Sequence, residues 1–368
     1  RLMYNDLLYQ IALTRVPQVG DVHAKNLAQV YGSAEAVFKA PKHQLEKLEG
    51  IGSIRAKNIK AFTQFKDGET EIAFLEKYHI APLFITHPNY PKRPLNCYDS
   101  PPLLYYKGNA DLNSSKIISI VGTRSNSDYG KYFCESFLQT LKASGILVVS
   151  GLAFGIDTLA HKNALKNNLP TVAVLAHGLD RIYPRENKSL AKQMAENGGL
   201  LTEFCSGTLP DKQNFPKRNR IVAGICDALI VVESGKKGGS LITAELANSY
   251  NKDVFALPGK STDTKSEGCN FLIKNNKALM ITEAGDLLKM MNWDQPKPIP
   301  KKQQRALFIE LQPNEKIIVE TLRQADKLFI DELYLQSGLS SSAVAQALLM
   351  LEMEGIVKSL PGKMYQLV

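Results

Sequence analysis

The chain has few cysteines, and none of them has a spacing that suits a metal site or a disulfide framework. Its 368 residues include five cysteines and six histidines, which are scattered and form no CxxC pair. Structural zinc sites need closely spaced thiolate and imidazole ligands, and disulfide-stapled domains need a dense set of cysteines. We therefore expect reduced thiols and no metal site.

Long apolar runs are also missing. A membrane-spanning helix needs about 18 or more apolar residues in a row, and no stretch approaches that length. The first twenty residues include Asp6, Arg15 and Pro17, which is unlike the apolar core of a secretory signal. The sequence therefore predicts a soluble, cytoplasmic protein without a membrane partner.

The glycine-rich stretches lack the fingerprints of nucleotide enzymes. GKKGGS (residues 235–240) is not a GxxxxGK[ST] loop, and neither VGTR nor SGLAFG forms GxGxxG with an acidic residue about 20 positions later. No nucleophile with an adjacent base is evident either. We therefore expect no nucleotide cofactor and no catalytic residues.

Positive charge is present in excess and is concentrated in the middle of the chain. Of 45 Lys+Arg and 36 Asp+Glu, residues 1–80 carry 11 and 9, and residues 301–368 carry 8 and 8, which leaves 26 and 19 for residues 81–300. An excess of cations in one domain is compatible with a polyanionic partner.

An internal repeat opens the chain. VPQVGDVHAKNL (residues 16–27) aligns with LEGIGSIRAKNI (residues 48–59), so that Gly20 matches Gly52 and Ala24 matches Ala56. Each copy has the pattern of a helix-hairpin-helix, in which a glycine turn exposes N–H groups at a helix start. Such pairs contact DNA or serve as packing modules, and the repeat leaves both functions open.

The central region alternates short apolar runs with helical segments, which is typical of a parallel sheet covered on both faces. This pattern predicts a Rossmann-like, doubly wound α/β domain. The expected strands lie in KIISIVG, ILVVSG, TVAVLA, LLTEF, ALIVVES and DVFALPG, and the expected helices cover residues 129–142, 156–166, 187–196 and 240–251.

The last part of the chain follows a Pro- and Lys-rich stretch, DQPKPIPKK, that reads as an extended linker. Three helical segments and a short hairpin then predict a winged helix. The expected recognition helix, residues 340–355, contains two Glu and no Lys or Arg. We therefore expect it to serve protein contacts or packing rather than DNA binding. The predicted domains are residues 1–80 (all-α helix-hairpin-helix, SAM-like), 81–294 (extended Rossmann-like), 295–305 (linker) and 306–368 (winged helix).

Four of the predicted strands end in glycine-rich loops: VGTR, SGLAFG, AHGLDRIYP and ESGKKGGS. Ligands of open parallel sheets bind at the carboxyl ends of the strands, where glycine lets backbone N–H groups approach phosphate oxygens. We expect Ser240 to cap the helix that follows the last of these loops. The four loops together predict a site for a phosphate-bearing ligand.

The stretch FPKRNRIVAG (residues 215–224) places three cations just before an apolar run. We expect it to begin a helix at the same sheet edge, with Lys217 and Arg220 on one side and Arg218 and Asn219 turned elsewhere. Cations at a helix start with Phe215 as a stacking surface suit a nucleic-acid strand better than a lone phosphate.

One acid/base pair invites a catalytic interpretation. Asp157 and His161 lie one helical turn apart in GIDTLAH, but no third ligand, nucleophile or second carboxylate accompanies them. We expect both residues to be structural, with Asp157 near a helix start.

These motifs, in this order, resemble the DNA processing protein A (DprA/Smf) family between about residues 90 and 284. The resemblance implies a non-enzymatic, dimeric protein that binds single-stranded DNA, loads the RecA recombinase onto it and protects DNA taken up in natural transformation. Carried over position by position, the DNA-binding residues would be Gly122, Thr123, Arg124, Phe215, Lys217, Arg218, Asn219, Arg220, Gly238, Gly239, Ser240 and Lys260.

Two other functions stay open. KKGGSLITAE partly matches the PGGxGTxxE loop of nucleotide-hydrolysing phosphoribohydrolases, although it lacks the Pro and the Gly-Thr pair and Glu245 is displaced by one position. The winged helix could instead make the protein a regulator that binds duplex DNA.

Overall fold

The computed structural model describes residues 2–294, 311–325, 327–360 and 363–368, which form two compact units, Arg1–Asp294 and Gln295–Val368. The predicted linker, residues 295–305, lies outside the described residues, as does the start of the predicted winged-helix domain. No helix in the described part of the chain is long and apolar enough to cross a membrane.

The first unit begins with six helices that contain the internal repeat. Helix α2 follows one copy of the glycine turn and α5 follows the other, and the two hairpins are tied together because Arg55 donates to Gln18 O (2.8 Å) and Asn58 to Pro17 O (2.8 Å). A cluster of aromatic rings, including Tyr9 and Phe65, packs inside. The helices are α1 (Leu2–Leu13), α2 (Asp21–Tyr31), α3 (Ala34–Lys39), α4 (Lys42–Glu46), α5 (Gly52–Ala61) and α6 (Phe65–Lys77).

A nine-stranded sheet with the order β1-β2-β6-β5-β4-β3-β7-β8-β9 forms the rest of this unit. Strands β3 to β9 are parallel to their neighbours, as the apolar runs predict, whereas β1 and β2 add an antiparallel edge beside β6 that the patterning did not indicate. The strands are β1 (Ala81–Phe84), β2 (Leu103–Gly108), β3 (Ile117–Val121), β4 (Leu147–Ser150), β5 (Thr171–Val174), β6 (Gly198–Thr202), β7 (Ala228–Val231), β8 (Asp253–Ala256) and β9 (Leu279–Met280).

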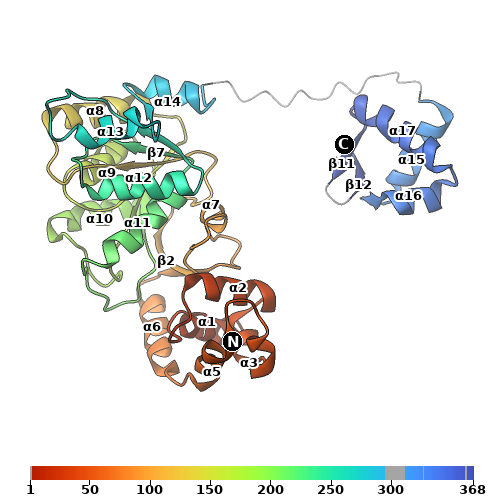
Figure 1. Ribbon diagram of the computed structural model, residues 1–368, viewed down its shortest axis with the longest axis horizontal. Helices are drawn as coiled ribbons and strands as arrows, with labels where there is room; N and C mark the ends of the chain where they lie inside the picture. Colours follow the sequence, from red (N-terminus) through yellow and green to blue (C-terminus); the bar gives the residue numbers. More distant parts are fainter. Residues whose placement is uncertain (1, 295–310, 326, 361–362) are drawn as a thin grey trace. The chain divides into compact units, whose positions relative to one another are not determined.

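Helices cover both faces of the sheet (Figure 1), and alternate residues of one strand supply both cores. Ile118 and Ile120 of β3 join the cluster that contains α8 and α9, while Ile117 and Val121 join the cluster that contains α11 and α12. The helices of this part of the chain are α7 (Lys92–Leu95), α8 (Asp128–Thr140), α9 (Ile156–Lys166), η1 (Arg185–Asn187), α10 (Lys188–Glu196), α11 (Asn214–Gly224), α12 (Gly239–Ser249), α13 (Glu267–Lys274) and α14 (Ala284–Met290). The predicted fold class is confirmed.

The second unit is the predicted winged helix. Its three helices enclose a small apolar core, and a three-stranded sheet of order β10-β12-β11 forms the wing. Helix α17 exposes Leu349, Met350 and Met353 rather than cations. The elements are α15 (Pro313–Arg323), β10 (Leu328–Phe329), α16 (Ile330–Ser337), α17 (Ser341–Met353), β11 (Val357–Leu360) and β12 (Met364–Leu367).

Candidate nucleic-acid interface

A cleft of about 410 Å³ opens where the strand order reverses. Strand β3 has β4 on one side and β7 on the other, and the loops after these three strands meet at the carboxyl edge of the sheet. Helix α11 forms the remaining wall with its first two turns. A crevice at this topological switch point is where doubly wound sheets bind their ligands.

Residues from two of the glycine loops line one side of the cleft. Gly122, Thr123 and Arg124 follow β3, and residues 238–240 lead into helix α12. The N-cap of α12 is Gly238, and its first turn carries no acidic side chain and no side-chain cap. The positive end of the helix dipole therefore favours an anion here.

Ser240 does not cap α12, so that prediction is wrong. Helix α12 begins one residue earlier than the sequence suggests, which places Ser240 inside the first turn, where its hydroxyl donates to Ser234 Oγ (2.8 Å). Gly238 leaves no room for a larger residue because a Cβ there would lie 2.5 Å from Ser234 Oγ. The loop is therefore packed tightly against the helix start.

Helix α11 presents Phe215, Arg218, Asn219 and Val222 to the cleft. These residues are three, four and seven positions apart, which is the spacing of one helical stripe. Arg218 is buried and donates to Val174 O and to Asn219 Oδ1, so its guanidinium is held in place at the bottom of the site.

Two of the predicted DNA-binding residues, Lys217 and Arg220, do not line the cleft. Lys217 and Arg220 lie on the opposite stripe, beside the buried carboxylate of Glu203, and Arg220 also pairs with Asp21 of α2 at 2.9 Å. The acidic partners come from distant parts of the sequence, and they turn these two cations away from the cleft. Lys260 is exposed and does not line the cleft either.

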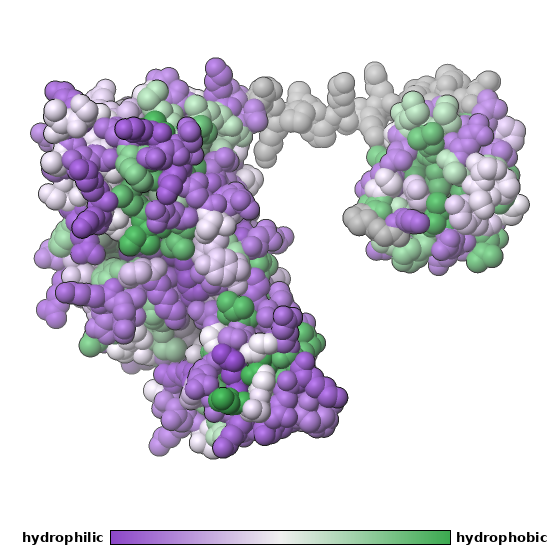
Figure 2. Space-filling view, in the orientation of Figure 1, coloured by the Kyte–Doolittle hydropathy of each residue, from purple (hydrophilic) through white to green (hydrophobic). Residues whose placement is uncertain are grey.

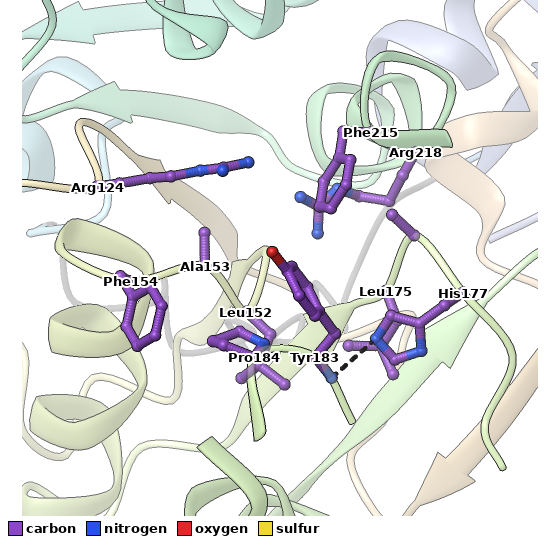
Figure 3. Close-up of a pocket in the computed structure, with 11 residues that line it drawn as sticks. Arg124, Leu152, Ala153, Phe154, Leu175, His177, Tyr183, Pro184, Phe215 and Arg218 are labelled. Atoms are coloured by element: carbon purple, nitrogen blue, oxygen red, sulfur yellow. Dashed lines mark hydrogen bonds between the residues drawn. The ribbon is translucent and has the colours of Figure 1, made fainter. Parts of the chain in front are cut away.

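A small apolar pocket adjoins the cleft and shares Arg124, Phe215 and Arg218 with it (Figure 3). The Arg124 guanidinium lies 5.3 Å from the centre of the Phe215 ring, and that of Arg218 lies 6.0 Å away. Tyr183 meets Phe215 edge-on at 6.1 Å, and Phe154 also lines the pocket. Stacked arginines and rings of this kind form a platform for flat, unpaired bases.

Phe154 and Tyr183 line the pocket but were not predicted as site residues. Tyr183 stands before a proline, a pattern that suggests a turn, and Phe154 stands inside a glycine loop. Both rings are nearly half exposed although each is large and apolar. The sequence could have indicated both residues, because each lies in a loop that follows a predicted strand, and these loops meet at the carboxyl edge of the sheet.

The charged groups beneath the cleft are held out of water. Burial lowers the pKa of Arg218, which Asp157 partly offsets, and burial raises the pKa of Asp157, which Arg218 partly offsets. Ala153 N–H also donates to Asp157 (3.3 Å). The Arg218 guanidinium is therefore held at the bottom of the cleft, where the Asp157 carboxylate partly compensates its charge.

His161 is completely buried one turn along α9. Its neutral ring donates from Nε2 to Gly151 O (2.6 Å) and accepts from the Thr171 hydroxyl at Nδ1 (2.7 Å), and burial lowers its pKa to about 4. Both nitrogens are thus occupied. Within the described residues, no group of three or more His, Cys, Asp or Glu side chains is placed to hold a metal ion.

Gly155 fixes the position of Arg124, and its replacement gives a first prediction. Its φ is +76°, and a Cβ would lie 2.2 Å from Thr123 O and 2.6 Å from the carbonyl carbon of Arg124. Gly155→Ala should lower the free energy of unfolding by about 2 kcal/mol more than Gly145→Ala, because overpacking adds to the cost of positive φ. Chemical denaturation measures both.

Gly145 is the matched control, since its φ is +70° and nothing lies within 4 Å of its Cβ position. Equal losses of stability in the two variants would show that the backbone of residues 123–124 yields freely, and that Gly155 does not hold Arg124 in place.

The fold and the site together define a Rossmann-like binding domain with a cationic, ring-lined cleft, flanked by a helix-hairpin-helix domain and a winged helix. The model of the family described as DNA recombination-mediator protein A matches residues 81–292. The model of the DprA winged helix domain matches residues 302–363, and that of a helix-hairpin-helix motif matches residues 11–71. The chain belongs to the DprA/Smf family.

Individual relatives agree with this assignment. Protein Smf from Synechocystis sp. is 34% identical over 97% of this chain and 98% of its own length. The X-ray structure of DNA processing protein A from Streptococcus pneumoniae is 33% identical, with a TM-score of 0.64 over 77% of this chain and 97% of that chain. A structure of the Helicobacter pylori protein, described by its single-stranded DNA binding mode, is 30% identical, with a TM-score of 0.54 over 60% of this chain and 98% of that chain.

Proposed function

We propose that this protein binds single-stranded DNA in the cleft between the β3, β4 and β7 loops and helix α11. The observation that carries the proposal is the position of the Arg124 and Arg218 guanidinium groups over the Phe215 ring, beside the start of helix α12, which has no side-chain cap. Phosphates would occupy the N–H side and bases the ring side. The Helicobacter pylori relative, described by its single-stranded DNA binding mode, supports the same ligand.

A strand fits the site better than a nucleotide substrate does. Glu245, the acidic residue of the phosphoribohydrolase-like motif, is exposed, lies 3.6 Å from Lys277 and does not line the cleft. The only carboxylate that lines the cleft, among the described residues, is that of Asp157, which is paired electrostatically with Arg218. We therefore propose a binding protein rather than a hydrolase.

The family resemblance extends this proposal to a biological role. We infer that the bound strand is delivered to RecA and protected during natural transformation or recombination, and that the protein acts in the cytoplasm. Exposed apolar side chains on α17 suit protein contacts better than phosphates. A winged helix without cations on that helix gives little support to a duplex-binding regulator.

We also propose that the protein is a homodimer. Strand β9 is the last strand of the sheet, so one of its edges is unpaired, and Leu279 and Met280 on it are about half exposed, as is Phe271 on the preceding helix. Open strand edges flanked by apolar side chains are commonly covered by a partner. In Figure 2, hydrophilic residues cover much of the visible face of the first unit, with smaller hydrophobic patches among them.

Titration of the purified chain with fluorescent single- and double-stranded DNA of one sequence tests the proposed ligand. We expect the single strand to bind more tightly, with log K falling against log salt by roughly 0.7 for each phosphate contacted. Equal affinity for both forms would contradict the proposal. Release of free base from nucleoside monophosphates would instead favour the hydrolase.

A further inference from the structure

A second groove, of about 520 Å³, lies between helices α9 and α10, on the flank of the same domain. Lys162 and Lys166 of α9 line one wall, and Glu186, Ser189 and Gln193 line the other. The groove is polar and lies apart from the cleft lining. None of the function proposed above uses it.

The cations around this groove are arranged in a way that costs stability. Lys162 and Lys166, which line the groove, are one helical turn apart. Lys188 and Lys192 of α10, which lie outside its lining, have the same spacing, so each pair repels at close range. Elsewhere the chain places Glu at this spacing, as in Lys39 with Glu35 at 2.7 Å. Like-charge pairs on two neighbouring helices indicate a surface arranged for an anionic partner.

The side chains of these four lysines are exposed, and within the described residues they form no ion pair and no hydrogen bond. Glu186 and Glu196 are the acidic residues on η1 and α10, whereas Arg185 adds a further exposed cation. The cations around the groove therefore outnumber the carboxylates.

The groove lies next to the ring-lined pocket. Asn187, which lines the groove, donates through Nδ2 to Leu152 O and to Thr158 Oγ1, both at 2.9 Å. Leu152 lines the pocket shown in Figure 3, and so do Tyr183 and Pro184, which directly precede η1. The two hollows thus share a wall, and α9 runs from the cleft along the groove for about 16 Å at 1.5 Å per residue.

We propose that the groove between α9 and α10 binds the sugar-phosphate backbone of the strand beyond the nucleotides held in the cleft. This inference rests on the proposed function, since it extends the path of the same ligand. A polar groove flanked by lysines without a ring in its lining suits phosphates rather than bases, so contacts there are independent of sequence. The position of the groove beside the pocket, across the wall that Asn187 and Leu152 form, favours this ligand over an acidic protein.

The test compares Lys162→Glu/Lys166→Glu with Lys66→Glu/Lys142→Glu, which makes the same charge change at exposed lysines outside the groove and the cleft. Both full-length variants are titrated with oligothymidylates of about 6 and about 30 nucleotides, lengths near the lower end of typical site sizes and above them. For the groove variant we expect unchanged binding of the short strand. Its affinity for the long strand should fall at least severalfold, and its salt slope should decrease by about 1.4, which is two contacts.

Equal long-strand affinity in the groove and control variants would overturn the groove proposal alone, provided that Arg124→Ala still weakens both lengths. If Arg124→Ala left both lengths unaffected, the proposed function would fail instead. If the groove variant lost as much affinity for the short strand as for the long strand, the proposal that the groove binds only the nucleotides beyond the cleft would be contradicted. Lys188→Glu/Lys192→Glu repeats the comparison on α10, and thermal denaturation identifies any variant that is misfolded.

Discussion

Replacement of Arg124 and Phe215 together by alanine is expected to lower the affinity for single-stranded DNA about a hundredfold. Stacking of one base on an aromatic side chain contributes about 1 to 3 kcal/mol, and loss of one phosphate contact reduces the salt slope by about 0.7. Arg124 is exposed and Phe215 is partly buried, so the fold should survive the change. Fluorescence anisotropy at several salt concentrations measures both quantities.

The two single variants complete a thermodynamic cycle. Because the Arg124 guanidinium stacks on the Phe215 ring, each residue positions the other, and we expect the single losses to sum to more than the loss in the double variant. Lys217→Ala serves as the control on the same helix, since its ammonium lies 3.3 Å from Glu203 and outside the cleft lining. A larger loss from Lys217→Ala than from Arg124→Ala would contradict the assigned cleft face of α11.

Arg220→Ala is expected to lower the free energy of unfolding by about 4 kcal/mol. Removing one partner of a buried ion pair leaves the other charge without compensation, which costs about 3 to 5 kcal/mol. Arg220 and Glu203 have side chains that are 7% and 4% exposed, and Glu203 Oε1 has no hydrogen-bond partner in the described part of the chain. Urea denaturation at neutral pH measures the loss.

The pH dependence identifies the cause of that loss. Burial raises the pKa of Glu203 and the Arg220 charge opposes this effect, so the variant's carboxyl should bind its proton at a higher pH. The folded state of the variant then gains protons relative to the unfolded state, and the deficit should shrink as the pH falls. Arg220→Ala/Glu203→Gln should regain part of the stability, whereas Lys217→Ala, which removes a half-exposed partner of the same carboxylate, should cost less than about 1 kcal/mol. A deficit that is independent of pH would indicate lost packing instead.

The sequence predicted the parallel strands and the loops of the site because both depend on local patterns. Continuous apolar runs such as IISIV identify buried strands, and a glycine after each run marks the edge at which those strands end. The positions of Gly122, Arg124 and Gly238 in one cleft follow from that pattern together with the order of the strands.

The rotation of α11 could not be predicted in the same way. Its direction depends on Glu203, which follows β6, and on Asp21, which lies in α2, and neither is near Arg220 in the sequence. Helical spacing places Arg218 on one stripe and Lys217 and Arg220 on another, but it does not indicate which stripe faces the ligand. The antiparallel strands β1 and β2 were not predicted for a related reason, since β2 pairs with β6, which is distant from it in the sequence.

The salt bridge between Arg220 and Asp21 has a consequence for communication along the chain. One guanidinium is shared by α2, which belongs to the hairpin repeat, and by α11, whose other stripe faces the cleft. A molecule that binds the hairpins and draws Asp21 away from Arg220 would change the affinity of the cleft for its strand. The strand would change the affinity of the hairpins for that molecule by the same factor, because coupling between two binding equilibria is reciprocal.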